Sequence, residues 1–547
     1  MKLRNIAVFI IIILSFAFFA CESCERIKTP ELRFKISFPS PDAKAKTGRI
    51  FIIISKSDKR EPRLQIGSWD SGAAFFAVDV ENLKPGEVAV IDDNVLGYPP
   101  KSFSEIPKGD YYIQGLFNVY TEFHRSDGHV IWAHMDQWEG QKFSISPGNL
   151  YSGVQPVQLD PSVGYTIEVS LNKRIPPVEA PADNEYVKNI KIQSRLLTEF
   201  WGHPIQLGAV VILPKGYETH PNVHYPIHYH QGHFSLSPMY NFSEHKEFYN
   251  AWTSEDFPRL IGVTFQHPCP YYDDSYAVNS ANCGPYGDAI MTELIPYIEE
   301  HFRVIRKPYA RVLSGGSTGG WEALALQLFH PDFFGGAWIF CPDPIDFRYY
   351  GLINIYEDNN AFYKEYEWMK VERPSMRDIH GQVLQTVRQM SQMEAVLGSK
   401  GRSGDQLDIW QAVYGPVGED GCPKPIWNKS TGEIDNEVAQ YFKEHYDLRY
   451  YTEKNWSWLG PKLEGKFHFL TGDMDSFYLN EAVYEFEKFL ENTKNPHDGG
   501  SFQYGRPREG HGWNPYGWFT GKHERVMAEY IIKIAPKGED TKQWKYR

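Results

Sequence analysis

Positive charge is scarce in this sequence of 547 residues. Lysine and arginine number 56 against 69 aspartate and glutamate residues, which gives a formal net charge of −13 at pH 7. A protein that binds the phosphate backbone needs a basic surface, so the charge balance argues against a nucleic-acid partner. Internal repeats and low-complexity tracts are also absent. With 42% hydrophobic and 23% charged residues, the chain is neither disordered nor fibrous.

Cysteine is rare as well, with only six residues. The one pair with metal-site spacing is Cys21 and Cys24, next to the N-terminal apolar run. Cys269 and Cys283 flank a single loop rich in tyrosine, aspartate and serine. In an oxidising compartment these two can pair as a disulfide, but spacing alone does not establish the geometry. The sequence leaves both states open.

Only one long apolar run is present, from Ile6 to Ala20. Two cations precede it, and it ends at Ala20-Cys21, which resembles the lipobox of bacterial lipoproteins. We therefore expect residues 1–20 to be a signal peptide and Cys21 to be the lipid-attachment site. The mature protein would be exported and anchored to a bacterial membrane, on the periplasmic face or at the cell surface. An uncleaved anchor and an ordinary secretory peptide are the alternatives, and both also place the body outside the cytoplasm.

The rest of the chain divides by pattern. Residues 21–32 are predicted to be a tether, and residues 33–172 contain short apolar runs separated by Gly, Pro and Asp, which is typical of a β-sandwich. A Pro/Ala-rich linker is expected at 173–185. Strand and helix patterns then alternate over 186–535, followed by a C-terminal tail at 536–547. Such a length predicts more than one domain.

The alternating part predicts a doubly wound, mostly parallel sheet, because continuous apolar strands alternate with helices. The expected strands are 208–214, 225–230, 260–265, 310–315, 336–341, 466–472 and 501–505, and the expected helices are 287–302, 318–329 and 479–493. Residues 343–464 interrupt this order without strand signals. We expect them to form a lid-like insertion over the strand ends, whose tryptophans either stack on sugars or pack the lid: Trp410, Trp427, Trp456 and Trp458.

A G-x-S-x-G motif lies between an expected strand and an expected helix. It spans Gly315 to Gly319, with Ser317 at its centre. In a sharp strand-to-helix turn of this kind, the glycines allow neighbouring backbone to pass, and the serine hydroxyl is directed off the strand end. The context predicts that Ser317 is a catalytic nucleophile.

A nucleophilic serine needs a base, and the base needs an acid that orients it. Downstream, Asp475 follows one expected strand and His511 follows the next, so all three groups meet at the carboxyl edge of the sheet. Asp473 is the rival acid, and we expect it to cap a helix instead. The order Ser317, Asp475, His511 is that of a triad on a doubly wound sheet.

The oxyanion donors are predicted to be two backbone N–H groups. One belongs to Thr318, directly after the nucleophile, and the other to His233, which follows Gly232 in the loop after an expected strand. His228 and His230 share a strand face nearby, where interior hydrogen bonds are the favoured interpretation over zinc ligation. We predict neither a metal nor a cofactor.

The runs YPIHYHQGHF and DSYAVNSANCGPYGDAIMTELIPYIEEHFRV, the serine motif, Gly-x-x-Asp and Gly-His-Gly together resemble an esterase family of the α/β-hydrolase superfamily. That family includes esterase D, feruloyl and acetylxylan esterases, and enterochelin esterase. The resemblance covers about 186–342 and 465–535, and it implies an α/β-hydrolase fold with serine esterase chemistry at Ser317, Asp475 and His511. Gln231, where the family commonly has histidine, and the large insertion depart from the pattern.

The sequence therefore predicts hydrolysis of an extracytoplasmic carboxylic ester through an acyl-enzyme. Candidate substrates are acyl or feruloyl groups on polysaccharides and siderophore esters, which is an argument by analogy. Two alternatives remain: a non-catalytic, glycan-binding surface lipoprotein, and an acyltransferase that uses the same triad.

Overall fold

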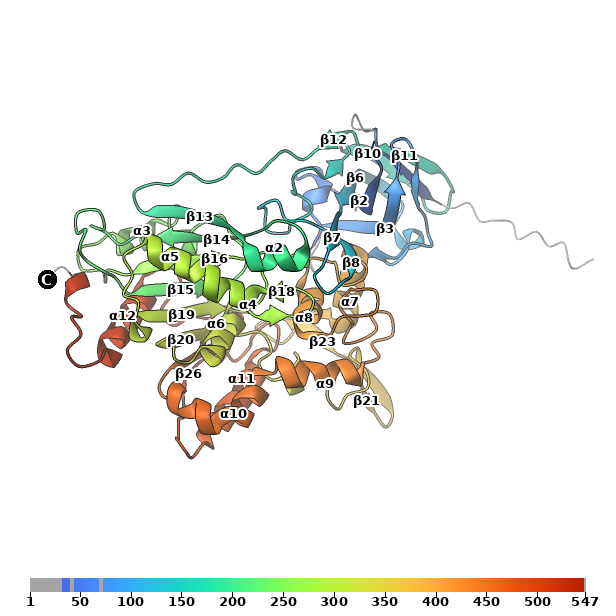
Figure 1. The fold of residues 1–547 in the computed structure, drawn as a ribbon. Helices are drawn as coiled ribbons and strands as arrows, with labels where there is room; N and C mark the ends of the chain where they lie inside the picture. Colours follow the sequence, from blue (N-terminus) through green and yellow to red (C-terminus); the bar gives the residue numbers. More distant parts are fainter. Residues whose placement is uncertain (1–31, 40–43, 68–71, 546–547) are drawn as a thin grey trace, which may run out of the picture.

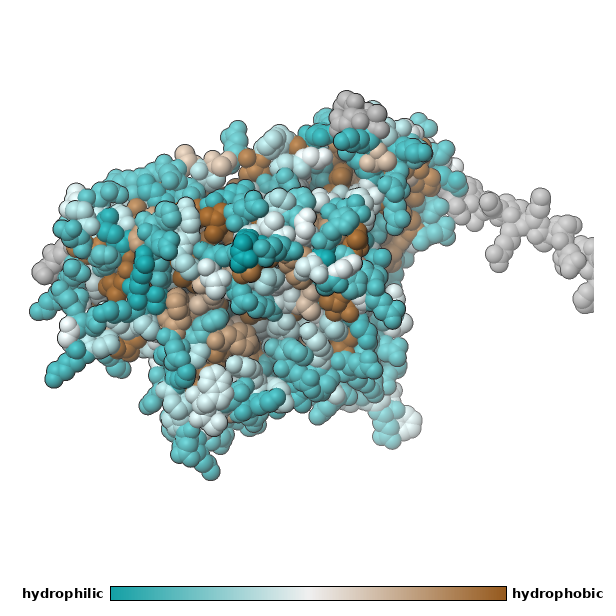
Figure 2. Space-filling view, viewed as in Figure 1, coloured by the Kyte–Doolittle hydropathy of each residue, from teal (hydrophilic) through white to brown (hydrophobic). Residues whose placement is uncertain are grey.

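The computed structural model describes residues 32–39, 44–67 and 72–545 (Figure 1). The predicted signal peptide, the lipid-attachment residue Cys21 and nearly all of the predicted tether lie outside these residues. In the described part of the chain, no helix has the length and apolar character needed to cross a membrane. On the face in Figure 2 most of the surface is hydrophilic, with small, separate apolar patches.

Two β-sheets form the N-terminal region. A three-stranded sheet has the order β11-β1-β4, with bounds Thr166–Ser170, Arg33–Ser37 and Ala89–Ile91. A seven-stranded sheet has the order β12-β9-β6-β2-β3-β5, with β10 also paired to β6. Its bounds are β2 (Lys46–Ser55), β3 (Ala73–Leu83), β5 (Gly97–Tyr98), β6 (Gly109–Val119), β9 (Leu150–Tyr151), β10 (Gln155–Leu159) and β12 (Lys173–Arg174). The hairpin of β7 (Thr121–His124) and β8 (Val130–Ala133) follows β6.

Strand β2 is buried on both faces. Its even-numbered isoleucines from Ile50 to Ile54 belong to a core shared with the three-stranded sheet. Its odd-numbered Phe51 and Ile53 belong to a second core that also contains Met393, far along the chain. Because successive strand residues face opposite sides of a sheet, two covered faces require an unbroken apolar run. This explains the sequence Ile-Phe-Ile-Ile-Ile in β2.

The central sheet has eight strands in the order β13-β14-β16-β15-β19-β20-β25-β26. Their bounds are β13 (Val187–Ser194), β14 (Ile205–Ile212), β15 (Ile227–Gln231), β16 (Ile261–Gln266), β19 (Arg311–Gly316), β20 (Gly336–Phe340), β25 (Phe467–Gly472) and β26 (Ser501–Gly505). The first three strands in this order pair antiparallel and all others pair parallel. The predicted mostly parallel sheet is confirmed. It has one additional edge strand, β13, whose alternation of polar residues gave no strong strand signal.

Helices cover both faces of this sheet. They are α2 (Arg195–Trp201), α3 (Lys246–Trp252), α4 (Tyr286–Ala289), α5 (Ile295–His301), α6 (Thr318–Phe329), α11 (Asn480–Glu491) and α12 (Lys522–Ile534). Strand β14 shows the division: Ala209 and Val211 belong to the main core, whereas Val210 and Ile212 pack in a separate cluster with Trp252 of α3. Alternate residues of a single strand therefore pack against helices on opposite faces of the sheet, as a doubly wound arrangement requires.

The insertion between β20 and β25 differs from expectation. It contains two hairpins, formed by β21 (Tyr363–Tyr366), β22 (Met369–Glu372), β23 (Pro374–Arg377) and β24 (Val383–Thr386). Four helices follow: α7 (Val387–Leu397), α8 (Gln406–Tyr414), α9 (Asn436–His445) and α10 (Leu448–Leu463). The expectation of no strands was wrong because β21 and β22 lie at the surface and are rich in charged residues. Side chains from α8, α9 and α10 belong to the main core, so the segment is integral to the fold.

Candidate active site

Ser317 occupies the tight turn between β19 and α6, with φ 57° and ψ −122°. This left-handed conformation is strained for a residue with a side chain. A Cβ on Gly315 would lie 2.1 Å from the Gly319 carbonyl oxygen, and a Cβ on Gly319 would lie 2.2 Å from the Gln231 carbonyl oxygen. Both motif glycines are therefore required, because backbone occupies the space that any side chain would need.

The Ser317 hydroxyl points to a residue that the sequence did not indicate. Its Oγ donates a hydrogen bond to Oδ1 of Asp343 at 3.1 Å. Asp343 lies just past the end of β20, and its backbone N–H donates to the Ser317 carbonyl at 3.1 Å. Within the described residues, no hydrogen bond joins Ser317 Oγ to His511. The expected serine–histidine contact therefore requires a rotation of the Ser317 side chain.

His511 and Asp475 are in direct contact. His511 Nδ1 lies 2.8 Å from Oδ2 of Asp475. Asp475 is fully buried, and its other oxygen accepts from the backbone N–H groups of Phe477 at 2.9 Å and Leu479 at 3.2 Å. A buried carboxylate with three donors has a fixed orientation, which suits an acid that orients a histidine.

The rival acid has other partners. Asp473 accepts from the Tyr484 hydroxyl at 2.8 Å and from Arg506 Nε at 3.0 Å. The expectation that Asp473 caps a helix was wrong, because both of its oxygens bind side chains instead.

The electrostatic surroundings favour a proton on His511. Burial alone would lower its pKa, but the sulfur of Cys341 and the carboxylate of Asp475 raise the pKa well above the ordinary value of 6.5. Cys341 directly follows β20, and its Sγ accepts from the Gly512 N–H at 3.4 Å. The imidazole therefore lies between two groups that stabilise its charged form.

The predicted oxyanion loop lies against the start of α6, as the close approach of Gln231 to Gly319 indicates. Thr318 is the first residue of α6, so its N–H has no partner within the helix. The side chain of His233 lies 3.0 Å from Asp273 and 3.3 Å from Asp274. Burial opposes a charge on His233, but these carboxylates raise its pKa well above the usual value. A cation is thus held beside the predicted oxyanion donors.

Ser317, His511, His233 and Asp343 line one cavity of about 440 Å³. Most of its other lining residues are apolar or aromatic and come from the insertion, among them Tyr350, Ile353, Met390, Met393, Trp410 and Trp427. Gly67 of the N-terminal region also contributes. Of the four tryptophans that the sequence indicated, Trp456 is buried elsewhere and Trp458 is 47% exposed. The insertion therefore forms most of the cavity wall.

Sequence reasoning missed Asp343 and Cys341. Both belong to the segment Cys-Pro-Asp, which ends the strand next to the nucleophile's strand. A polar residue at the carboxyl end of a neighbouring parallel strand is the signal that indicates them. Burial raises the pKa of Asp343, while hydrogen bonds from Tyr276 and Trp410 oppose that shift.

Two groups of side chains have the spacing of metal ligands: Cys341, Asp475 and His511, and His233, Asp273 and Asp274. In each group the histidine already contacts a carboxylate at 3.0 Å or less. The histidines singled out on β15 form no such group among the described residues. His228 and His230 both contact the Ser314 hydroxyl, at 2.6 and 2.9 Å. The ring nitrogens that make these contacts are therefore hydrogen-bonded to Ser314.

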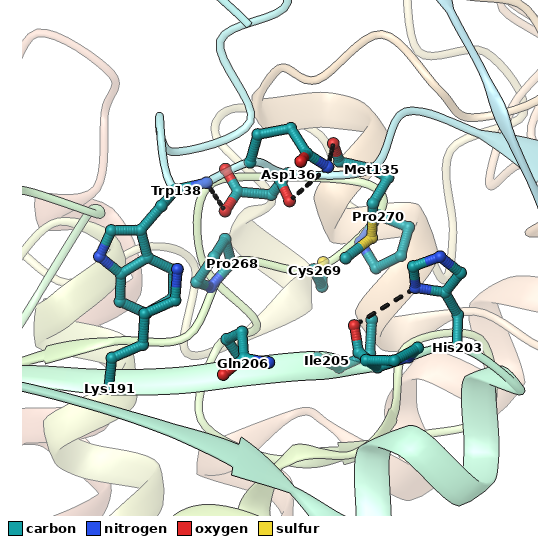
Figure 3. Close-up of a pocket in the computed structure, with 12 residues that line it drawn as sticks. Met135, Asp136, Trp138, Lys191, His203, Ile205, Gln206, Pro268, Cys269 and Pro270 are labelled. Carbon is teal, nitrogen blue, oxygen red and sulfur yellow. Dashed lines mark hydrogen bonds between the residues drawn. The ribbon is translucent and has the colours of Figure 1, made fainter. Parts of the chain in front are cut away.

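Cys269 and Cys283 are buried as free thiols, so the structure does not form the disulfide that spacing left open. Burial and a hydrogen bond with the Cys283 thiol raise the pKa of Cys269, which keeps the Cys269 thiol protonated. Cys269 also lines a second pocket, of about 250 Å³, between the loop at Asp136 and the edge of the central sheet (Figure 3). The Asp136 carboxylate accepts there from the Trp138 N–H at 2.8 Å.

Part of the chain is similar to a known protein family. Residues 205–470 match the family model described as "Putative esterase". No curated protein matches the chain. A solved ferulic acid esterase is 16% identical, covers 64% of this chain and 98% of its own, and has a TM-score of 0.35. An S-formylglutathione hydrolase from Agrobacterium tumefaciens is 15% identical, with coverages of 63% and 95% and a TM-score of 0.33. A CE1 ferulic acid esterase from Anaeromyces mucronatus is 16% identical, with coverages of 64% and 94% and a TM-score of 0.29.

Proposed function

We propose that this chain is a serine esterase in which Ser317, His511 and Asp475 carry out ester hydrolysis; its residues 205–470 match the esterase family model, which supports the proposal. The observation that supports this assignment most strongly is the shared cavity. A strained serine and a histidine oriented by a buried carboxylate line the same space. The α/β-hydrolase order of the triad agrees with it.

The proposed reaction proceeds through an acyl-enzyme. Ser317 turns from Asp343 to His511, Nε2 of His511 takes the hydroxyl proton, and Oγ attacks the ester carbonyl carbon. The N–H groups of Thr318 and His233 bind the oxyanion, and His511 returns the proton to the departing alcohol. Water then attacks the acyl-serine, with His511 again as the base, and the acid is released. Asp475 holds His511 in the required tautomer throughout.

The proposed substrate is an extracytoplasmic ester, such as an acyl or feruloyl group on a polysaccharide or a siderophore ester. The size and aromatic lining of the cavity suit an acyl group larger than acetyl. The N-terminal sheets share a core, and we take them together as a β-sandwich preceding the esterase domain at 186–535.

Replacing Ser317 tests the assignment. Ser317→Ala should abolish turnover of aryl acetate and aryl ferulate esters and remove labelling by a fluorophosphonate, because no other group supplies the attacking oxygen. Ser430→Ala, at an exposed turn, is the matched control and should keep both activities. Full turnover in Ser317→Ala, or a label on another residue, would refute the assignment.

The anchor is a second part of the proposal. Lys2, Arg4, the apolar run and Ala20-Cys21 support export and acylation at Cys21. Radiolabelled palmitate should be incorporated by the wild type and by Cys24→Ser, but not by Cys21→Ser, and membrane association should follow the label. Label retained in Cys21→Ser would contradict lipid attachment at this residue.

A further inference from the structure

The two oxygens of the Asp343 carboxylate have very different surroundings. Oδ2 accepts hydrogen bonds from four groups: Thr318 Oγ1 at 3.1 Å, Gln406 Nε2 at 3.1 Å, Trp410 Nε1 at 3.2 Å and the Tyr276 hydroxyl. Oδ1 accepts from the Ser317 hydroxyl at 3.1 Å. Asp343 is 2% exposed and lines the catalytic cavity. One oxygen is therefore saturated by the protein, and the other depends on the nucleophile.

Catalysis removes the donor on which Oδ1 depends. Once Ser317 Oγ is bonded to an acyl carbon, it has no hydrogen to donate. A buried acceptor that loses its donor is costly to leave unpaired. An acyl group that brings its own donor to this position restores the bond, so Asp343 discriminates between acyl groups by their hydrogen-bonding groups.

The position of Asp343 specifies where that donor must be. A hydroxyl on the α-carbon of the acyl group is three bonds from Oγ, through the carbonyl carbon and the α-carbon. In the resting structure Oγ lies 3.1 Å from Oδ1 of Asp343. Rotation of Ser317 towards His511 vacates that position, and the α-hydroxyl of an acyl group attached to the rotated Oγ can reach back to it and donate to Oδ1. The Oδ1 oxygen of Asp343 acts as an acceptor towards Ser317, so a group that restores this bond must carry a hydrogen. The cationic His233 and His511 are already paired with their own carboxylates.

We propose that Asp343 is a specificity-determining residue that selects esters of 2-hydroxy acids through its Oδ1 oxygen. This inference rests on the proposed role of Ser317 and identifies the class of acyl group.

Three small methyl esters test the proposal on the full exported protein: methyl lactate in each enantiomer, methyl 2-methoxypropionate and methyl propionate. The methoxy ester has a similar electron-withdrawing substituent without the donor hydrogen. For the wild type, kcat/KM for one lactate enantiomer should exceed that for the methoxy ester by about tenfold or more, since a site built to bind a hydroxyl rejects the analogue that cannot donate. A ratio near one in the wild type would overturn the proposal without any variant.

Asp343→Asn replaces the acceptor oxygen Oδ1, which faces Ser317, by a hydrogen-bond donor. The Trp410 N–H can only donate, so the amide oxygen must stay on the Oδ2 side and its NH₂ must face Ser317. The lactate preference should fall to within about twofold in this variant, whereas Asp473→Asn should keep the wild-type ratio. An unchanged ratio in Asp343→Asn would refute the role of Asp343. Turnover that persists in Ser317→Ala would instead refute the proposed function itself, so the two failures are distinguishable.

Discussion

At the scale of single residues, two aspartates with the same side chain have different roles because their surroundings differ. Asp473 and Asp475 are two positions apart, yet one binds a tyrosine and an arginine while the other is fully buried against His511. The backbone N–H groups after Asp475 fix the orientation of its carboxylate. The difference arises from the turn between β25 and α11, which directs the second carboxylate towards the loop after β26.

Asp475→Asn should lower kcat for an aryl acetate by about 10⁴-fold, because an amide holds the imidazole in the wrong tautomer. Asp473→Asn is the matched control and should lie within about tenfold of the wild type. Steady-state kinetics of the two variants decide the matter. If Asp473→Asn were the more damaging change, the orienting acid would be misassigned.

The pH dependence of kcat/KM follows from the charge on His511. Only the neutral imidazole accepts a proton, and the neighbours of His511 raise its pKa well above 6.5. Activity should therefore rise with pH through a midpoint above that of an ordinary histidine. In Asp475→Asn the midpoint of the residual activity should shift to lower pH, because the carboxylate that raises the pKa of His511 is gone. An identical midpoint in both proteins would show that Asp475 does not set this pKa.

Ser317 was predictable from sequence because its signal is local: glycines, a preceding strand and a following helix occur within a dozen residues. Asp343 was not predictable in the same way. Its partners Tyr276 and Gln406 are 67 and 63 residues away, and only the packing of the insertion brings them together. Residues whose role depends on contacts between distant segments leave little trace in a single sequence.

At the scale of elements, α8 shows that the insertion is packed into the core as well as lining the cavity. Every residue of Gln406–Tyr414 except Gln406 is buried. A helix that is apolar over most of its surface is typical of a protein interior, whereas a lid has one polar face. The sequence Gln-Leu-Asp-Ile-Trp-Gln-Ala-Val-Tyr does not indicate a fully buried helix, because it contains polar residues. Its buried polar residues form hydrogen bonds inside the protein. The Asp408 carboxylate, for example, accepts from Gln411 at 3.0 Å.

Leu407→Ala should reduce the free energy of unfolding by about 2–5 kcal/mol, because it leaves a cavity in a fully buried helix. Trp368→Ser, at the tip of the hairpin β21–β22, removes a side chain that is 89% exposed and should change stability by less than about 0.5 kcal/mol. Urea unfolding measures both. Equal, small effects would show that α8 is a detachable cover and not part of the core.

At the scale of the whole molecule, helix α7 joins the N-terminal sheets to the catalytic domain. Met393, Val396 and Leu397 pack in one cluster with side chains of β2. Arg49 of β2 donates to the Val396 carbonyl at 2.9 Å and pairs with Asp79 at 2.7 Å. Since Met390 and Met393 also line the catalytic cavity, the same helix belongs to the interface and to the site.

Arg49→Ala should lower the free energy of unfolding by about 1–2 kcal/mol, because it leaves the buried Val396 carbonyl without its donor, whereas the ion-pair partner Asp79 is 36% exposed and contributes little. It should also reduce kcat/KM for a bulky aryl ester, since α7 loses part of its support. Lys108→Ala removes an ion pair whose lysine is 70% exposed and should leave the melting temperature close to that of the wild type, because solvent screens exposed charges. Melting curves with turnover assays would test this. Loss of stability without any change in turnover would separate the interface from the site.

The packing of α7 against β2 also restricts how such a gene can change. Two parts of a chain that meet only at a linker can be separated by recombination. Here, because α7 packs against β2, the segment between β12 and β13 is not the main connection. A shortened gene that began after it would encode a helix with three apolar side chains facing water, and a cavity wall without its backing. The two halves are therefore expected to be inherited together, as a single evolutionary unit.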